Sequence, residues 1–467
     1  MTAEPGVTHQ LVQLTAHPLQ RVGAFVLAAL TGRQHPDMVS EADLQLAVRR
    51  MGEDLLDTTE LEDSKAPGGF WLGASQMLWP NKKPLSHPIR GRLSPSERRG
   101  LLREWRTLPG PEESIGVPCT LCSRPACGFF GKVDVPLALS ENYRNSTARG
   151  HDGMALCRGC LASFHALPYG CAISGGRATV LHSWDERFMA KTVTIRVRRM
   201  LRDATVAAGA FGAKRPYARQ VAALNEIRGY EERFTAGVEL IVFSNGNREQ
   251  VLDRHEMDQP LAEWLRTKRH DPRFTAGWQY LLRAHHSAKV PGRSALARNF
   301  FDQPHRVISV TASYLLRLVA DLRLPPGESP ELQAVCYDYA IEVLDVSKSD
   351  ADQIRDLASH VAELVSDDGS QFMKYVQAAR KPRDLQRWLQ RQAISQVRFT
   401  RKPDAFITEE QWRLLFDSED AYLNRDLLLI AMLEKVHKLD PQWRTDDAAK
   451  RKEADDEAGT EEEELDT

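Results

Sequence analysis

Two short motifs decide how this chain folds: Cys119-Thr-Leu-Cys122 and Cys157-Arg-Gly-Cys160, with 34 residues between Cys122 and Cys157. A Cys-x-x-Cys knuckle presents two thiolates with the spacing that a tetrahedral zinc ion requires. Two knuckles complete the coordination sphere and leave no position for water, which is typical of a structural rather than a catalytic zinc site. We therefore predict a structural Zn²⁺ that stabilises an insert over residues 116–172.

Other nearby residues leave the ligand set open. Cys127 or Cys171, or His151 or His165, could replace one of the four cysteines. A pair of redox motifs is a weaker interpretation, because neither motif has the strand–helix context of redox proteins. The chain has seven cysteines, and clustering of Cys-x-x-Cys pairs indicates metal binding in a reducing compartment rather than a secreted disulfide scaffold. We expect a cytoplasmic location.

Charge divides the chain of 467 residues into two parts. Residues 446–467 hold 11 acidic and 3 basic side chains, so the rest carries a formal charge of +6 against an overall −2. An acidic segment without aromatic residues cannot bury a core, and we expect it to be a disordered tail. No apolar run approaches the roughly 20 residues of a membrane helix, and no export signal is evident at the N-terminus.

The pattern beyond the motifs predicts a mostly helical, multidomain α+β protein with a zinc-finger insert and a C-terminal helix bundle. The expected segments are an N-terminal mainly helical region (1–115), the zinc-binding insert (116–172), a mixed α/β basic region (173–293), the helical bundle (294–440) and the acidic tail (441–467). Length alone gives a soft expectation of about three domains.

Capping signals and apolar spacing predict several helices. Ser40 with Asp43, Ser94-Pro95, and Thr408 with Gln411 each resemble a helix start, and the apolar residues from Val22 to Leu30 recur at helical spacing. Residues 64–95 are rich in proline and glycine, so we expect loops there.

Enrichment in β-branched residues predicts strands at Ala178–Leu181, Thr192–Val197 and Val238–Phe243. Asn245-Gly246 after the last of these indicates a two-residue hairpin turn.

Two stretches are strongly basic: residues 187–233 hold 11 basic and 4 acidic residues, and residues 374–402 hold 9 basic and 1 acidic. Such surfaces attract phosphate backbones, with an affinity that falls steeply with salt. A basic helix face can also be merely solvated, and Trp388 is better explained as core than as a base-stacking platform. Arg391 also lies in the second stretch. The candidate nucleic-acid-binding residues are Arg196, Arg198, Arg199, Arg202, Lys214, Arg215, Arg380, Lys381, Arg383, Arg387, Arg401 and Lys402.

Signatures of common enzymes are missing: there is no Walker loop, no Gly-x-Gly-x-x-Gly after a strand, no His-Glu-x-x-His and no Gly-x-Ser-x-Gly. We therefore predict a binding protein without catalytic residues. Two alternatives remain: a zinc-containing nuclease that uses His151, Asp152 and His182, and a zinc-stabilised scaffold that binds only proteins.

Several segments together resemble the large subunit of type I-B CRISPR interference complexes (Cascade), a family with a double Cys-x-x-Cys insert. These segments are Leu14–Phe25 (LTAHPLQRVGAF), the helix start Ser40-Glu-Ala-Asp43, Trp79-Pro80-Asn81, the two cysteine motifs, Phe406-Ile-Thr408 and Asn424–Ile430 (NRDLLLI). The resemblance extends to about Leu439 and excludes the acidic tail; only the paired Cys-x-x-Cys is individually specific.

The resemblance implies a non-catalytic subunit of a crRNA-guided surveillance complex. Such subunits recognise the protospacer-adjacent motif in duplex target DNA, assist R-loop formation, hold the displaced single strand and help to recruit a helicase-nuclease. Sequence is then read mainly by base pairing with the guide. The implied partners are target DNA, the other subunits of the complex and the helicase-nuclease, with no membrane. No family motif identifies motif-reading residues here, although loops at Asn245-Gly246-Asn247 or Lys214-Arg215 could enter a DNA groove.

Overall fold

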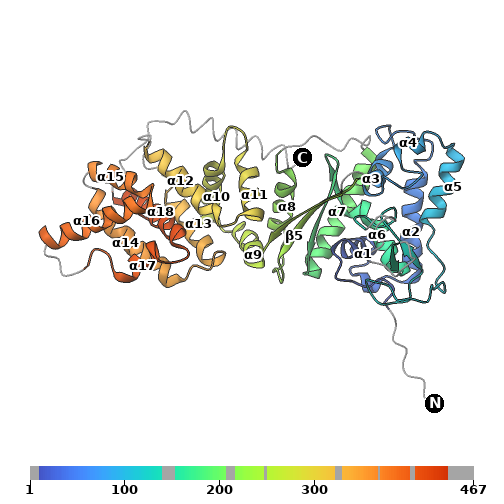
Figure 1. The fold of residues 1–467 in the computed structure, drawn as a ribbon, viewed down its shortest axis with the longest axis horizontal. Helices are drawn as coiled ribbons and strands as arrows, with labels where there is room; N and C mark the ends of the chain where they lie inside the picture. The colour runs from blue at the N-terminus through green and yellow to red at the C-terminus, as the bar shows by residue number, and fades with distance from the viewer. Residues whose placement is uncertain are drawn as a thin grey trace, which may run out of the picture. The chain divides into compact units, whose positions relative to one another are not determined.

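The computed structural model describes residues 10–138, 153–206, 216–246, 250–320, 329–366, 369–399 and 405–439. These residues form a mostly helical α+β structure, as the sequence predicts (Figure 1). The chain divides into two compact units, unit 1 with residues 1–215 and 234–256, and unit 2 with residues 216–233 and 257–467. The finer division into five segments stays a prediction, and the acidic tail lies outside the described residues.

Unit 1 begins with helices whose starts follow the predicted capping signals. Ser40 and Asp43 form a reciprocal capping box, and Ser94 and Glu97 form another. The helical elements of unit 1 are α1 (Pro18–Leu30), η1 (Pro36–Met38), α2 (Glu41–Leu56), α3 (Phe70–Leu78), α4 (His87–Arg90), α5 (Pro95–Arg106), α6 (Arg158–Gly170) and α7 (Glu186–Val206).

The loop prediction for residues 64–95 is wrong over α3 and α4. Gly69 precedes α3 and Pro80 follows it, so these residues bound the helix instead of interrupting it. Leu72 and Leu78 on α3 are fully buried, and the ring of Trp71 lies 4.2 Å from that of Tyr169 on α6. Burial of this apolar face stabilises a helix in a segment of loop-like composition.

Helices α1 and α6 form the centre of the unit 1 core. A Cβ atom at Gly23 of α1 would lie 1.8 Å from the carbonyl oxygen of Ser163 on α6, so only glycine allows this close approach. Phe25 and Phe164 are buried in the same core.

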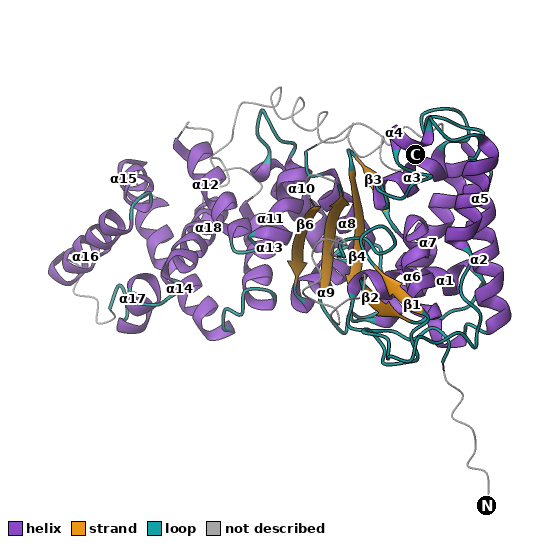
Figure 2. Ribbon diagram, turned by 45° about the vertical axis from the view of Figure 1, so that its right-hand side comes forward, coloured by secondary structure: helices purple, strands orange, loops and turns teal. Residues whose placement is uncertain are grey.

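The strands form two sheets (Figure 2). One has four strands in the order β3-β4-β5-β6, and a separate two-stranded sheet pairs β1 with β2. Pairing of β3 with β4 and of β4 with β5 is antiparallel. The strands are β1 (Gly128–Phe130), β2 (Met154–Leu156), β3 (Ala172–Ser174), β4 (Arg177–Ser183), β5 (Val238–Asn245) and β6 (Gln250–Met257). The predicted strands at Ala178–Leu181 and Val238–Phe243 are confirmed.

The third predicted strand, Thr192–Val197, is wrong because this segment lies inside α7. Met189, Val193, Val197 and Met200 are buried at helical spacing along α7. This apolar stripe packs into the unit 1 core and overrides the local β preference of the branched residues.

The predicted hairpin after Val238–Phe243 is confirmed, because β5 and β6 are neighbours in the sheet, but Asn245 belongs to β5 and not to a two-residue turn. Asn245 is the last residue of β5 and is 1% exposed. Its side-chain amide donates to the carbonyl oxygen of Leu78 over 2.7 Å, and its side-chain oxygen accepts from the N–H of Leu137. A side chain held in this way is not available to a DNA groove, and Asn247 lies outside the described residues.

Unit 2 is helical, with α13, α14 and α18 in mutual contact around its core. Thr408 and Gln411 form the predicted capping box at the start of α17. Its helices are α8 (Ala218–Arg228), α9 (Gln259–Lys268), α10 (Pro272–His285), α11 (Gly292–Asp302), α12 (Arg306–Ala320), α13 (Ser329–Glu342), α14 (Lys348–Ser366), α15 (Gly369–Ala379), α16 (Pro382–Phe399), α17 (Glu409–Phe416) and α18 (Ala421–Leu439). Among the described residues, no helix has both the length and the apolar character needed to cross a membrane.

Candidate zinc centre and nucleic-acid interface

The first knuckle is a tight turn that holds Cys119 and Cys122 side by side. The N–H of Cys119 donates to the carbonyl oxygen of Arg124 over 2.6 Å, and the N–H of Ser123 donates to the carbonyl oxygen of Cys119 over 2.9 Å. Ser123 adopts a φ of 62°, in the left-handed region that a tight reversal needs. The turn therefore directs two sulfur atoms to one side of the backbone.

Pairing between β1 and β2 brings the second knuckle to the first. Gly128 of β1 is opposite Leu156 of β2, and Cys157 follows β2 directly. The N–H of Thr120, inside the first knuckle, donates to the carbonyl oxygen of Ala155 over 2.9 Å. Both knuckles are therefore held next to each other by their attachment to β2.

The second knuckle forms the start of α6. Cys157 is the N-cap residue, with φ −81° and ψ 166°, and its side chain makes no capping hydrogen bond. Cys160 lies in the first helical turn. The partial positive charge at a helix N-terminus favours thiolates, so this arrangement suits two metal ligands.

The four sulfur atoms of Cys119, Cys122, Cys157 and Cys160, called here the cysteine cluster, lie within 4.8 Å of one another. The Sγ atoms of Cys122 and Cys157 are 3.5 Å apart. Zn–S bonds of about 2.3 Å in a tetrahedron place sulfur atoms about 3.8 Å apart. All seven cysteines are free, so the cluster has the dimensions of a zinc site and contains no disulfide.

Ionisation of all four cysteines in this cluster requires a nearby cation. Cys119, Cys157 and Cys160 are buried and Cys122 is half-buried. Hydrogen bonding with Cys122 lowers the pKa of Cys119, whereas hydrogen bonding with Cys119 raises the pKa of Cys160. Four thiolates this close would repel one another strongly in a low-dielectric interior, and a divalent cation offsets that repulsion. The donor set therefore fits Zn²⁺.

The other candidate ligands within the described residues lie outside the cluster. Cys127 has its sulfur 3.2 Å from the carbonyl oxygen of Leu156, and burial raises its pKa to about 11. Burial likewise raises the pKa of Cys171 to about 12. His165 is buried against Trp79 and Trp105. His151 lies outside the described residues.

Residues that the sequence did not single out support the knuckles. A Cβ atom at Gly159 would lie 2.3 Å from the carbonyl oxygen of Leu11, so glycine is required between Cys157 and Cys160. Both guanidinium Nη atoms of Arg158 donate to the carboxylate of Glu41 on α2, over 3.0 and 2.8 Å. Arg124 donates to the carbonyl oxygen of Leu11 over 2.8 Å. Gly159, inside the second Cys-x-x-Cys motif, is the one feature of the sequence from which this packing could have been predicted.

The first basic stretch lies largely on α7. Arg198, Arg199 and Arg202 are exposed on this helix and Arg196 is half-buried, while Val197 faces the core. Helical geometry therefore separates the predicted basic residues from the apolar stripe.

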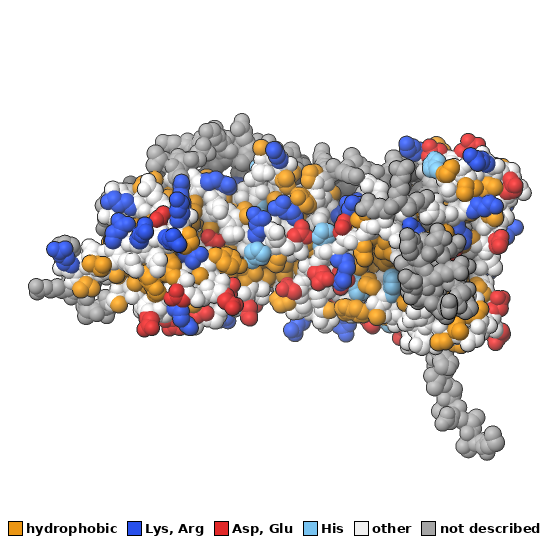
Figure 3. Space-filling view, viewed as in Figure 1, with side chains coloured by type: hydrophobic (Ala, Val, Ile, Leu, Met, Phe, Trp, Pro, Cys, Tyr) orange, Lys and Arg blue, Asp and Glu red, His pale blue; other side chains and the backbone are white. Residues whose placement is uncertain are grey.

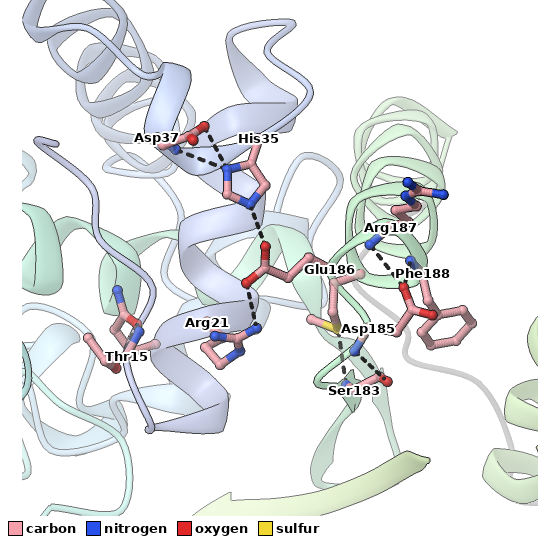
Figure 4. Close-up of polar contacts among 11 residues, drawn as sticks. Thr15, Arg21, His35, Asp37, Ser183, Asp185, Glu186, Arg187 and Phe188 are labelled. Atoms are coloured by element: carbon pink, nitrogen blue, oxygen red, sulfur yellow. Dashed lines mark hydrogen bonds and ion pairs between the residues drawn. The ribbon is translucent and has the colours of Figure 1, made fainter. Parts of the chain in front are cut away.

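Figure 4 shows how polar contacts fix the start of α7 on α1. A carboxylate oxygen of Asp185 accepts from the N–H of Phe188 over 3.1 Å and so caps the helix. Glu186 accepts from a guanidinium nitrogen of Arg21 over 3.5 Å and lies 3.1 Å from Nε2 of His35. The orientation of the basic helix is thus determined by the core of unit 1.

Part of the second basic stretch lies on α16. Arg383, Arg387 and Arg391 are exposed and four residues apart, which places them on one side of the helix; we call them the arginine face. Leu385 and Leu389 are buried on the opposite side. Figure 3 shows lysine and arginine side chains gathered over α15 and α16.

Two further cations extend the arginine face at its N-terminal end. Arg380 and Lys381 are exposed just before α16. Trp388 is 5% exposed, with its ring 5.2 Å from that of Tyr375, so its interpretation as a core residue is confirmed. Lys214, Arg215, Arg401 and Lys402 lie outside the described residues.

The geometry around His182 does not resemble a nuclease metal site. Its side chain is fully buried, with Nδ1 3.3 Å from a carboxylate oxygen of Glu239, and burial lowers its pKa to about 4. Within the described residues, the cysteine cluster is the one group of three or more potential ligands that could hold a metal ion. His151 and Asp152 lie outside them.

Comparisons of the chain with protein-family models, with curated proteins and with solved structures found no match.

Proposed function

We propose that the cysteine cluster binds one structural Zn²⁺ and that the chain is a non-catalytic, nucleic-acid-binding subunit. The convergence of four sulfur atoms within 4.8 Å supports the zinc ion. When bound, the ion would cross-link the first knuckle to the start of α6 and stabilise unit 1. Four protein ligands leave no open position, so the ion would supply no catalysis.

The single observation that carries nucleic-acid binding is the arginine face of α16. Arg383, Arg387 and Arg391 present three guanidinium groups along about 12 Å of one helix side. Asp384 is the one acidic residue in the sequence from 374 to 402, and its carboxylate lies 4.0 Å from the guanidinium of Arg387, at the limit of an ion pair. A row of arginines on a rigid helix suits the repeated phosphates of a strand.

The resemblance to Cascade large subunits extends this proposal to a specific role. The subunit would act in the cytoplasm within a crRNA-guided complex, recognise the protospacer-adjacent motif in target DNA and support R-loop formation and helicase-nuclease recruitment. The arginine face would then contact the backbone of target DNA or of the displaced strand. Guide pairing, rather than these arginines, would read the sequence.

One observation favours the scaffold alternative. Ile394 and Val397, three residues apart on α16, are 67% and 75% exposed. Apolar side chains exposed beside a basic helix face are also compatible with a protein partner.

Binding of a single-stranded oligonucleotide over a range of salt concentrations tests the proposal. The full chain should bind with an affinity that falls steeply with salt, and the fall should become shallower when the arginine face is neutralised. The scaffold alternative would be favoured by a different result: binding that is lost when Ile394 and Val397 are replaced, but that changes neither with salt nor when the arginine face is neutralised.

A further inference from the structure

Unit 2 contains a cavity with a volume of about 200 Å³. None of its lining residues belongs to α16, which carries the arginine face. Its walls come from the end of α8, from α9 and α10, and from α13. Ordinary pockets for drug-sized ligands start at about 300 Å³. This cavity is therefore large enough to enclose one ring system, and the rest of a larger ligand would lie at its open side.

The lining carries positive charge. Arg228, Lys268 and Arg269 line the cavity, and no aspartate or glutamate is among its lining residues. Lys268 forms an ion pair with Asp338 over 2.8 Å, which fixes its ammonium group. The guanidinium group of Arg269 donates from Nη1 to the carbonyl oxygen of Arg228 over 3.2 Å. An anion entering the cavity would meet the guanidinium groups of Arg228 and Arg269 and the ammonium group of Lys268, and the last of these already pairs with Asp338.

The same walls offer flat surfaces. The guanidinium carbon of Arg228 lies 4.0 Å from the centre of the Trp278 ring. Trp278 is itself parallel to Phe300, with the ring planes 11° apart and the centres separated by 6.0 Å. Trp264 is fixed by a 2.6 Å hydrogen bond from its indole N–H to Asp338. Guanidinium and indole planes are the surfaces on which unpaired bases stack.

Polar groups on α10 complete the lining. Thr275 and Gln279 are four residues apart and both line the cavity, so a hydroxyl and a carboxamide lie on one wall. Such groups can donate to and accept from the edge of a base. Positive charge, a stacking plane and a mixed donor–acceptor wall are together the features that bind nucleotides.

We propose that this cavity binds one nucleotide, with its base against the Arg228–Trp278 pair and its phosphate near Lys268 and Arg269. The nucleotide could be a free mononucleotide or one unpaired residue of a strand. The inference rests on the proposed function only for the second source.

The cations at the ends of α8 and α9 also have a simpler role that needs no ligand. Helices α8 and α9 end at Arg228 and Lys268, and basic residues at helix C-termini stabilise the helix dipole. That role requires the positive charges but not the aromatic ring of Trp278. A ligand whose binding depends on both its base and its phosphate therefore distinguishes a nucleotide site from helix stabilisation alone.

The experiment titrates the full chain with AMP, adenosine and inorganic phosphate by calorimetry. AMP should bind more tightly than either fragment. Arg228→Gln and Trp278→Leu should each weaken AMP binding by about ten-fold or more, whereas Trp278→Phe should retain most of it. Arg317→Gln is the matched control, because Arg317 is exposed on α12 and does not line the cavity. Unfolding midpoints confirm that each variant folds.

Competition identifies the source of the nucleotide. Displacement of AMP by an intact single-stranded oligonucleotide, but not by its abasic backbone, would assign the cavity to a strand; no displacement would assign it to free nucleotides. Phosphate binding as tightly as AMP, wild-type AMP binding in both Arg228→Gln and Trp278→Leu, or no AMP binding would overturn the proposal. If AMP still binds after the arginine face is neutralised, the cavity is a nucleotide site even when the chain does not bind an oligonucleotide.

Discussion

The Sγ atoms of Cys122 and Cys157 lie 3.5 Å apart although the two residues are 35 positions apart in the chain. The contact depends on β1 pairing with β2, since Cys157 follows β2 and the first knuckle bonds to the same strand. A metal ion at this point would therefore hold together a strand pair, a turn and a helix start.

Cys119→Ser and Cys157→Ser should each lower bound zinc and solubility together, because either change removes one of four ligands from a buried centre. Zinc content per folded chain, measured by elemental mass spectrometry, checks the prediction. Cys127→Ser is the control, since Cys127 adjoins the same strand outside the cluster and should keep a full equivalent of zinc. Full zinc occupancy in either ligand variant would show that the ligand set is wrong.

Gly159→Ala should lower the free energy of unfolding by roughly 1–3 kcal/mol, because the added Cβ would lie 2.3 Å from the carbonyl oxygen of Leu11. Zinc should also dissociate faster from this variant, since the second knuckle must shift. Gly52→Ala is a matched control on α2, with no atom within 4 Å of the added Cβ, and should stabilise by about 0.5–1 kcal/mol. Chemical denaturation of the zinc-loaded proteins compares them; equal stability of both variants would contradict the packing.

Neutralising the arginine face by Arg383→Gln, Arg387→Gln and Arg391→Gln should weaken strand binding and make its salt dependence shallower. Each lost phosphate contact on a single strand should change the log–log salt slope by about 0.7. The control triple variant, Arg49→Gln, Arg92→Gln and Arg103→Gln, removes the same charge from exposed positions of unit 1. Fluorescence anisotropy at several salt concentrations measures both; equal slopes for the two triple variants would count against the interface.

Asp426→Asn should stabilise the protein at neutral pH. Burial raises the pKa of Asp426 to about 6 in the folded chain, above its value of roughly 3.9 when unfolded. The folded state thus holds the proton more tightly, so stability is fully present below about pH 4 and is lost as the pH rises through about 6. The variant should gain roughly 1–3 kcal/mol at pH 7.5 and little at pH 4.

Urea denaturation at both pH values measures this difference. Asp356→Asn, at an exposed position on α14, is the comparison for replacing a carboxylate by an amide. A gain for Asp426→Asn that is equal at both pH values would mean that ionisation of this carboxyl is not its cause.

Much of the local structure could be predicted because its causes are local. Ser40, Ser94 and Thr408 start helices through hydrogen bonds to residues three positions away, and a sequence displays that spacing directly. The four cysteines could be predicted for the same reason, since each knuckle is a short motif. Their convergence in the structure is consistent with the expected zinc site.

Features that depend on tertiary packing could not be predicted. The segment Thr192–Val197 has β-branched residues, yet its burial on α1 and α6 makes it helical. Asn245 resembles a turn residue but satisfies buried carbonyl groups. The cavity in unit 2 combines residues from α8, α9, α10 and α13, which no spacing rule connects.

Native mass spectrometry of the purified full chain shows directly whether the cysteine cluster holds a metal ion. We predict a mass that corresponds to one zinc ion per folded chain, and a shift to the higher charge states of unfolded protein when a chelator removes the metal. A folded chain at its metal-free mass, unchanged by added zinc, would contradict it.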